Sequence, residues 1–98
     1  SPVFSAVTRT RDELSIVCPA AQVPADVRQE RGWALFKFQG PFAFTQTGVL
    51  ASVLAPLATA RIGILAVSTF DTDYLLVQQA DAPAAITALE SAGHRVQP

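Results

Sequence analysis

The order of the hydrophobic segments after residue 32 restricts the fold more than any other feature of this sequence. Short runs with a period of two, typical of strands, and longer runs with helical spacing follow one another as strand, helix, strand, strand, helix, strand. The predicted segments are Trp33–Gln39, a helix beginning near Gly48, Ile64–Thr69, Tyr74–Gln78, a helix after Asp81, and His94–Gln97. This order is that of the split βαβ arrangement. We therefore predict an α+β fold of the ferredoxin-like βαββαβ type, with an antiparallel four-stranded sheet and both helices on one face.

The first strand and the first helix have clear periodicities. The strand alternates between two sets of side chains, which are Trp33, Leu35 and Lys37 on one face and Ala34, Phe36 and Phe38 on the other. The helix has an apolar stripe made of Val49, Leu50, Val53, Leu54, Leu57 and Ala58. Pro56 lies inside this helix and removes one hydrogen bond, so we expect a kink or a 3₁₀ turn there. Because the stripe continues past Pro56, the prediction of a helix is kept.

The first 32 residues are different in pattern. Two short β-branched runs, Val3–Arg9 and Leu14–Cys18, predict a strand pair that precedes the sandwich. Prolines and glycine then interrupt the periodicity, which indicates a connector with a possible helical turn over Asp26–Glu30. The predicted organisation is a strand pair with its connector over 1–32 and a second domain over 33–98.

Charge and composition exclude several classes of function. The 7 Lys and Arg are balanced by 8 Asp and Glu, which gives a net charge of −1. The acidic residues are interleaved with the arginines near the start of the chain, so we expect no nucleic-acid partner. No apolar run approaches the length of about 20 residues that a membrane helix needs, so we expect no membrane partner. The sequence contains no Met, and we expect the native start to lie upstream or to have been removed.

Reactive side chains are scarce. Cys18 is the sole cysteine and His94 the sole histidine, so no intrachain disulfide and no paired-thiol metal site are expected. No Ser, Cys or Lys has a nearby His at a recognisable spacing, which argues against an enzyme. We expect no cofactor, a cytoplasmic location, and a solvated surface position for His94 next to Arg95.

Three groups of residues carry a resemblance that covers most of the chain. They are Glu13–Pro19, Thr47–Ala51 with Ala55–Ala58, and Ser68–Val77. Together they resemble the ACT domain family, specifically the branch of small bacterial ACT proteins related to the eukaryotic cytosolic arginine sensors. The last group is the most specific, because a run of Ser-Thr-Phe-Asp-Thr-Asp-Tyr at a hairpin is improbable by chance. The resemblance implies that 33–98 is an ACT domain and that 1–32 is the remnant of a degenerate ACT-like unit.

The resemblance implies a regulatory module that binds a free amino acid and acts by ligand-dependent association or allostery. The residues implied to bind the ligand are Gln46, Thr47, Gly48, Val49, Thr69, Phe70, Asp71, Thr72 and Asp73. A helix that begins near Gly48 offers backbone N–H groups to an α-carboxylate. In the arginine-sensing relatives the position that matches Asp73 reaches the guanidinium of the ligand. Gln46 stands where those sensors have an acidic residue, which weakens the case for arginine.

Two alternatives remain open at this point. Asp71 and Asp73 can simply shape a tight turn through their own backbone. The domain can also be a non-catalytic oligomerisation or interaction module that binds no ligand. Because no helix covers the second face of the predicted sheet, the first strand pair, a missing N-terminal segment or another subunit must shield it, and we expect a homodimer or a higher oligomer under either hypothesis.

Overall fold

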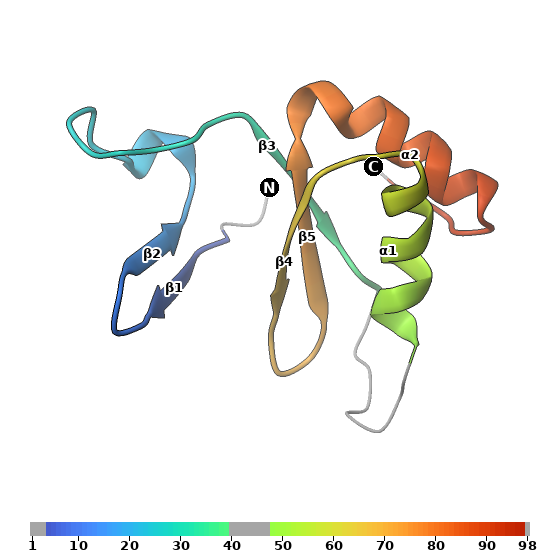
Figure 1. Cartoon of the computed structure of the whole chain (residues 1–98), viewed down its shortest axis with the longest axis horizontal. Coiled ribbons are helices and arrows are strands. Elements are labelled where there is room, and N and C mark those ends of the chain that lie inside the picture. Colours follow the sequence, from blue (N-terminus) through green and yellow to red (C-terminus); the bar gives the residue numbers. More distant parts are fainter. Residues whose placement is uncertain (1–3, 40–47, 98) are drawn as a thin grey trace. The chain divides into compact units, whose positions relative to one another are not determined.

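The computed structural model describes residues 4–39 and 48–97 of the chain (Figure 1). Its elements are β1 (Ala6–Arg9), β2 (Leu14–Val17), η1 (Ala20–Gln22), β3 (Trp33–Lys37), α1 (Val49–Thr59), β4 (Ile64–Ser68), β5 (Asp73–Gln78), η2 (Gln79–Asp81) and α2 (Ala82–Ser91). The chain divides into two compact units, residues 1–31 and residues 32–98. Each unit has its own sheet, so each is described by itself.

The first unit contains the antiparallel pair of β1 and β2, which confirms the predicted strand pair. Thr10 closes the turn, because its Oγ1 accepts the N–H groups of Asp12 and Glu13 at 3.2 and 3.1 Å. The helical turn predicted over 26–30 is not formed. A 3₁₀ turn, η1, occurs earlier instead, and the backbone then makes a single turn in which the Val27 N–H donates to the Pro24 carbonyl at 3.4 Å.

The second unit is built on a three-stranded antiparallel sheet with the order β3-β5-β4. The central strand, β5, is the most buried of the three, and its Leu75, Leu76 and Val77 are all buried. The alternation predicted for β3 is confirmed, because Ala34, Phe36 and Phe38 belong to the hydrophobic core or pack against it.

The core lies between this sheet and both helices. Leu57 of α1 and Leu75 and Val77 of β5 are its most deeply buried large side chains, with no more than 2% of their surface exposed. Ala85 and Leu89 of α2, together with Phe38 and Ile62, complete the cluster. Because the buried strand residues of this cluster all belong to one face of the sheet, both helices cover that same face (Figure 1). The predicted α+β class with both helices on one side is therefore observed.

Helix α1 runs through Pro56 without ending, as predicted, and it remains α-helical there instead of forming a 3₁₀ turn. Proline has no N–H, so it cannot donate the usual i to i−4 hydrogen bond, which here would go to the carbonyl of Ser52. His94 Nε2 lies 2.8 Å from that carbonyl oxygen. The expectation that His94 is a solvated surface residue is therefore wrong: it is half-buried and bonded to α1.

The strand predicted over His94–Gln97 is not formed, so the sheet has three strands within the residues that the structure describes. After α2 the backbone turns at Gly93, with φ of +96°, and the His94 N–H donates to the Leu89 carbonyl at 3.0 Å. The backbone and the ring of His94 are thus bonded to the two helices. Val96 packs against the core without joining a ladder.

Candidate functional site

The turn between β4 and β5, together with Asp73 at the start of β5, contains five of the nine residues that the sequence indicates for ligand binding. Thr69 and Thr72 close it. The Thr69 N–H and Oγ1 both donate to the Thr72 carbonyl, at 2.8 and 2.9 Å, and the Thr72 N–H donates back to Thr69 Oγ1 at 3.3 Å. The turn is thus held by threonine hydroxyls and backbone, and the two aspartates have no part in these bonds.

Thr72 also fixes the turn to the neighbouring strand. Its side chain is buried, with 7% of its surface exposed, and its hydroxyl donates to the Phe38 carbonyl at 3.0 Å. The Phe38 N–H in turn donates to the Asp73 carbonyl at 3.0 Å. Because these two bonds lie just beyond the end of β3, the turn is anchored to the segment that leads toward α1.

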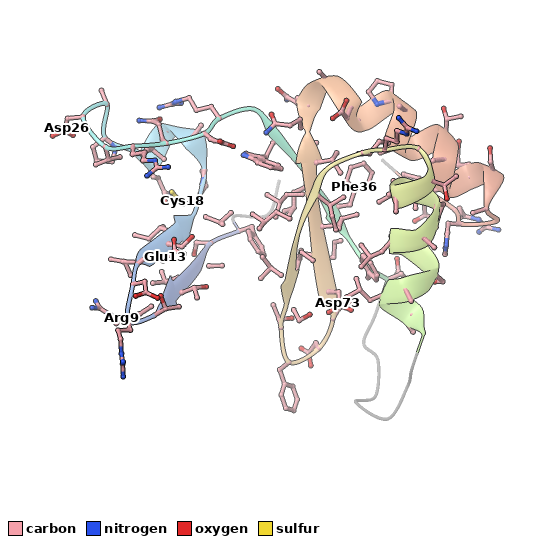
Figure 2. The ribbon with its side chains drawn as sticks, in the orientation of Figure 1. Arg9, Glu13, Cys18, Asp26, Phe36 and Asp73 are labelled. Atoms are coloured by element: carbon pink, nitrogen blue, oxygen red, sulfur yellow. The ribbon has the colours of Figure 1, made fainter. Side chains whose placement is uncertain are left out.

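Asp73, the position expected to contact the basic end of a ligand, is the first residue of β5 and is half-buried (Figure 2). Ser68 is directly opposite it in the ladder, and the Ser68 hydroxyl donates to Asp73 Oδ1 at 2.5 Å. A hydroxyl donor at this distance makes a strong bond to a carboxylate, so it fixes the orientation of the side chain. Asp71 and Phe70 are at the tip of the turn, where both are exposed.

The second predicted part of the site is the start of α1. Gly48 is the N-cap and has φ of +81°, a left-handed conformation that glycine adopts without a steric penalty. A Cβ built at Gly48 would meet no described atom within 4 Å. Val49 is the first residue of the helix. Gln46 and Thr47 lie outside the described residues.

The turn and the start of α1 lie at the same end of the second unit (Figure 1). The end of β3 lies there too, because Lys37 pairs with Tyr74 near the start of β5. The structure thus brings Thr69, Phe70, Asp71 and Thr72 together in the turn, with Asp73 beside them at the start of β5, and places Gly48 and Val49 at the same end. Within the part of the chain that the structure describes, none of the hydrogen bonds made by the side chains of Ser68, Thr69 and Thr72 reaches Gly48 or Val49.

Ser68 is the site residue that the sequence analysis did not include. The predicted strands, Ile64–Thr69 and Tyr74–Gln78, put Thr69 in the ladder and Asp73 in the turn. In the structure Thr69 belongs to the turn and Asp73 belongs to the strand. The paired threonines at 69 and 72 are the signal that could have shown this, because their hydroxyls close the turn between them.

Over residues 4–39 and 48–97, no group of three or more His, Cys, Asp or Glu side chains is arranged to hold a metal ion. Cys18 is a free, half-buried thiol. Nor is any helix in the same ranges long and apolar enough to cross a bilayer.

A protein family with a known domain matches most of the second unit, residues 32–98. The ACT domain model matches residues 28–91, and the chain belongs to this family. ACT domains are typically ligand-binding regulatory modules rather than catalysts. A separate family model, which describes an N-terminal domain, matches residues 1–26.

Two solved structures are similar to the chain. A protein from Agobacterium tumefaciens, determined by X-ray crystallography, is 52% identical with a TM-score of 0.91, and the match covers 99% of this chain and 72% of that protein. A protein from Vibrio cholerae, described as of unknown function and a possible transport protein, is 20% identical with a TM-score of 0.71, over 91% of this chain and 69% of that protein. The second similarity shows the fold alone. No curated protein sequence matches the chain.

Proposed function

We propose that this protein is a regulatory module that binds a free amino acid between the start of α1 and the turn that joins β4 to β5. The observation that carries the proposal is the fixed carboxylate of Asp73, held by Ser68 at the end of the sheet where α1 begins. The bound amino acid then changes the association or the activity of a partner protein. The proposal includes a relation between this chain and the cytosolic arginine sensors.

The start of α1 suits the acidic end of an amino acid. The first-turn N–H groups of a helix have no partner within the helix, and the aligned peptide dipoles make this end attractive to an anion. Gly48 has no side chain to cap these groups or to obstruct a ligand. A carboxylate that accepts these amide hydrogen bonds gains roughly 0.3–1 kcal/mol from the dipole at an exposed position.

Asp73 suits the basic end. One oxygen of its carboxylate accepts the Ser68 hydroxyl, and a carboxylate has further lone pairs for an ammonium or a guanidinium group. Hydrogen bonds between charged partners are about twice as strong as neutral ones. Asp71 adds a second negative charge at the tip of the same turn. The pair favours a ligand with a positive group, and Gln46 in place of an acidic residue makes arginine a weaker candidate than amino acids in general.

A second candidate function is subunit association without a ligand. The face of the sheet that none of the described helices covers contains Leu35 and Leu65, which flank Leu76 in one row of the ladder and are 39% and 40% exposed. Partly exposed leucines on a sheet face favour association. We propose a homodimer for either function, and light scattering that finds a monomer at high micromolar concentration would contradict it.

The test is a thermal-shift panel of the common amino acids on the parent protein. A ligand present at 100 times its Kd adds about 2.7 kcal/mol, which corresponds to a rise in Tm of roughly 10–20 °C for a domain of this size. The variant Asp73→Asn should lose most of this shift. Asp12→Asn removes the same charge in the first unit and should keep the shift in full.

A second pair of variants tests the helix end of the site. Gly48 and Gly93 both have positive φ, and at each of them no described atom lies within 4 Å of the position that a Cβ would occupy, so alanine strains the backbone similarly at both. Gly48→Ala should abolish the ligand shift, because its methyl group lies where the carboxylate must approach. Gly93→Ala should lower Tm and preserve the shift. No response of the parent to any amino acid would favour the association function instead.

A further inference from the structure

His94 makes a hydrogen bond that the sequence of α1 requires. The carbonyl of residue i in a helix normally accepts the N–H of residue i+4. For Ser52 that residue is Pro56, which has no N–H and whose ring crowds the same carbonyl. His94 is 42 positions further along the chain, and its Nε2 lies 2.8 Å from the Ser52 oxygen. The imidazole therefore stands in for the missing backbone donor.

The contact defines which ring nitrogen carries hydrogen. A carbonyl oxygen can only accept, so Nε2 must be the donor, and this assignment follows from the partner. Both the neutral Nε2–H tautomer and the imidazolium can make this bond. A side chain with a donor at a similar reach, such as glutamine, can replace it, whereas alanine and phenylalanine cannot.

The bond joins two elements at a defined place. On one side, the residues after α2 are fixed, since the Gly93 N–H donates to the Glu90 carbonyl and the His94 N–H to the Leu89 carbonyl, both at 3.0 Å. On the other side, Ser52 belongs to the first turn of α1. Its N–H donates to the Gly48 carbonyl at 2.9 Å, and its hydroxyl donates to the Val49 carbonyl at 2.7 Å.

We propose that His94 is a positioning residue: through Ser52 it holds the first turn of α1 against the end of α2. Loss of the bond leaves that turn free to move relative to α2. The last step, that this movement weakens ligand binding, rests on the proposed amino-acid site at Gly48. The proposal also gives a reason for the pairing of a proline at 56 with a histidine at 94 in this chain.

A double-mutant cycle between His94 and Pro56 tests the inference directly. His94→Ala should lower Tm by roughly 2–4 °C, the low end for one hydrogen bond in a domain of this size, because this bond is exposed. His94→Gln should restore most of the loss, and His94→Phe should not. In the Pro56→Ala background the helix regains its own N–H donor, so His94→Ala should then cost less than half of its effect in the parent. Equal costs in the two backgrounds would overturn the proposal.

Hydrogen exchange and ligand binding separate positioning from general stability. In His94→Ala the amides of α1 should exchange at least several-fold faster, while those of β5 remain unchanged. Equal acceleration in both elements would overturn a local role. If an amino acid stabilises the parent, its Kd should rise several-fold in His94→Ala and return in the double variant with Pro56→Ala. An unchanged Kd would refute an effect of His94 on the ligand site. A parent protein that binds no amino acid would refute the proposed function, and the exchange result would still decide the role of His94.

Discussion

The buried hydroxyl of Thr72 offers the sharpest test of how the hairpin turn is anchored. Thr72→Val keeps the shape of the side chain and replaces the hydroxyl by a methyl group. The Phe38 carbonyl, which accepts that hydroxyl at 3.0 Å, then loses its side-chain donor. Because Thr72 is only 7% exposed, water cannot easily replace the donor. An unsatisfied buried acceptor costs about 1–3 kcal/mol, so Tm should fall by at least about 4 °C.

The assay is thermal unfolding followed by circular dichroism, with Thr72→Ser as the control. Serine keeps the hydroxyl and loses one buried methyl group, so its loss of stability should arise from packing alone. Hydrogen exchange at the Phe38 amide adds a local measurement, because that amide donates to the Asp73 carbonyl beside the mutated bond. A valine variant as stable as the parent, with unchanged exchange at Phe38, would refute the reasoning that this hydroxyl anchors the turn.

Three further variants test other parts of the second unit. Leu57→Ala should destabilise by about 2–5 kcal/mol, measured by urea unfolding, because Leu57 is 1% exposed in the centre of the core; a loss below about 1 kcal/mol would contradict the described packing. Gly48→Ala should cost about 1–2 kcal/mol, because its φ of +81° is unfavourable for any residue with a Cβ, and an unchanged Tm would mean that the backbone is free to change. Ser68→Ala should cost less than about 1 kcal/mol, since its bond to Asp73 is exposed, and a larger loss would indicate that this bond supports the fold.

Much of the fold could be predicted from the sequence because two periodicities determine it. The period of two in β3 separates Phe36 from Leu35, and the helical stripe of α1 outweighs the proline within it. Both patterns report which side of an element is buried, and burial of these side chains is what orders the second unit. The ACT domain model matches residues 28–91, which include most of the second unit.

The last predicted strand is not formed. A pattern of side chains does not show that groups outside the sheet bond to one of its residues. His94 begins a short run that looks extended, yet its ring bonds Ser52 and its N–H bonds Leu89. The need for a donor at Ser52 arises from Pro56, which is distant in sequence. The turn differs from the prediction for the same reason. Thr69 is outside the ladder, because its hydroxyl and its N–H both donate to the Thr72 carbonyl.

The central position of β5 also affects how this protein is made. Both neighbours of β5, the strands β3 and β4, precede it in the chain. During synthesis from the N-terminus, these two strands emerge from the ribosome before their shared partner does. Their apolar side chains and unpaired backbone groups are exposed in the nascent chain during that interval. The ladder closes on both sides only when Gln78 has emerged, so the sheet is assembled late and around its last strand.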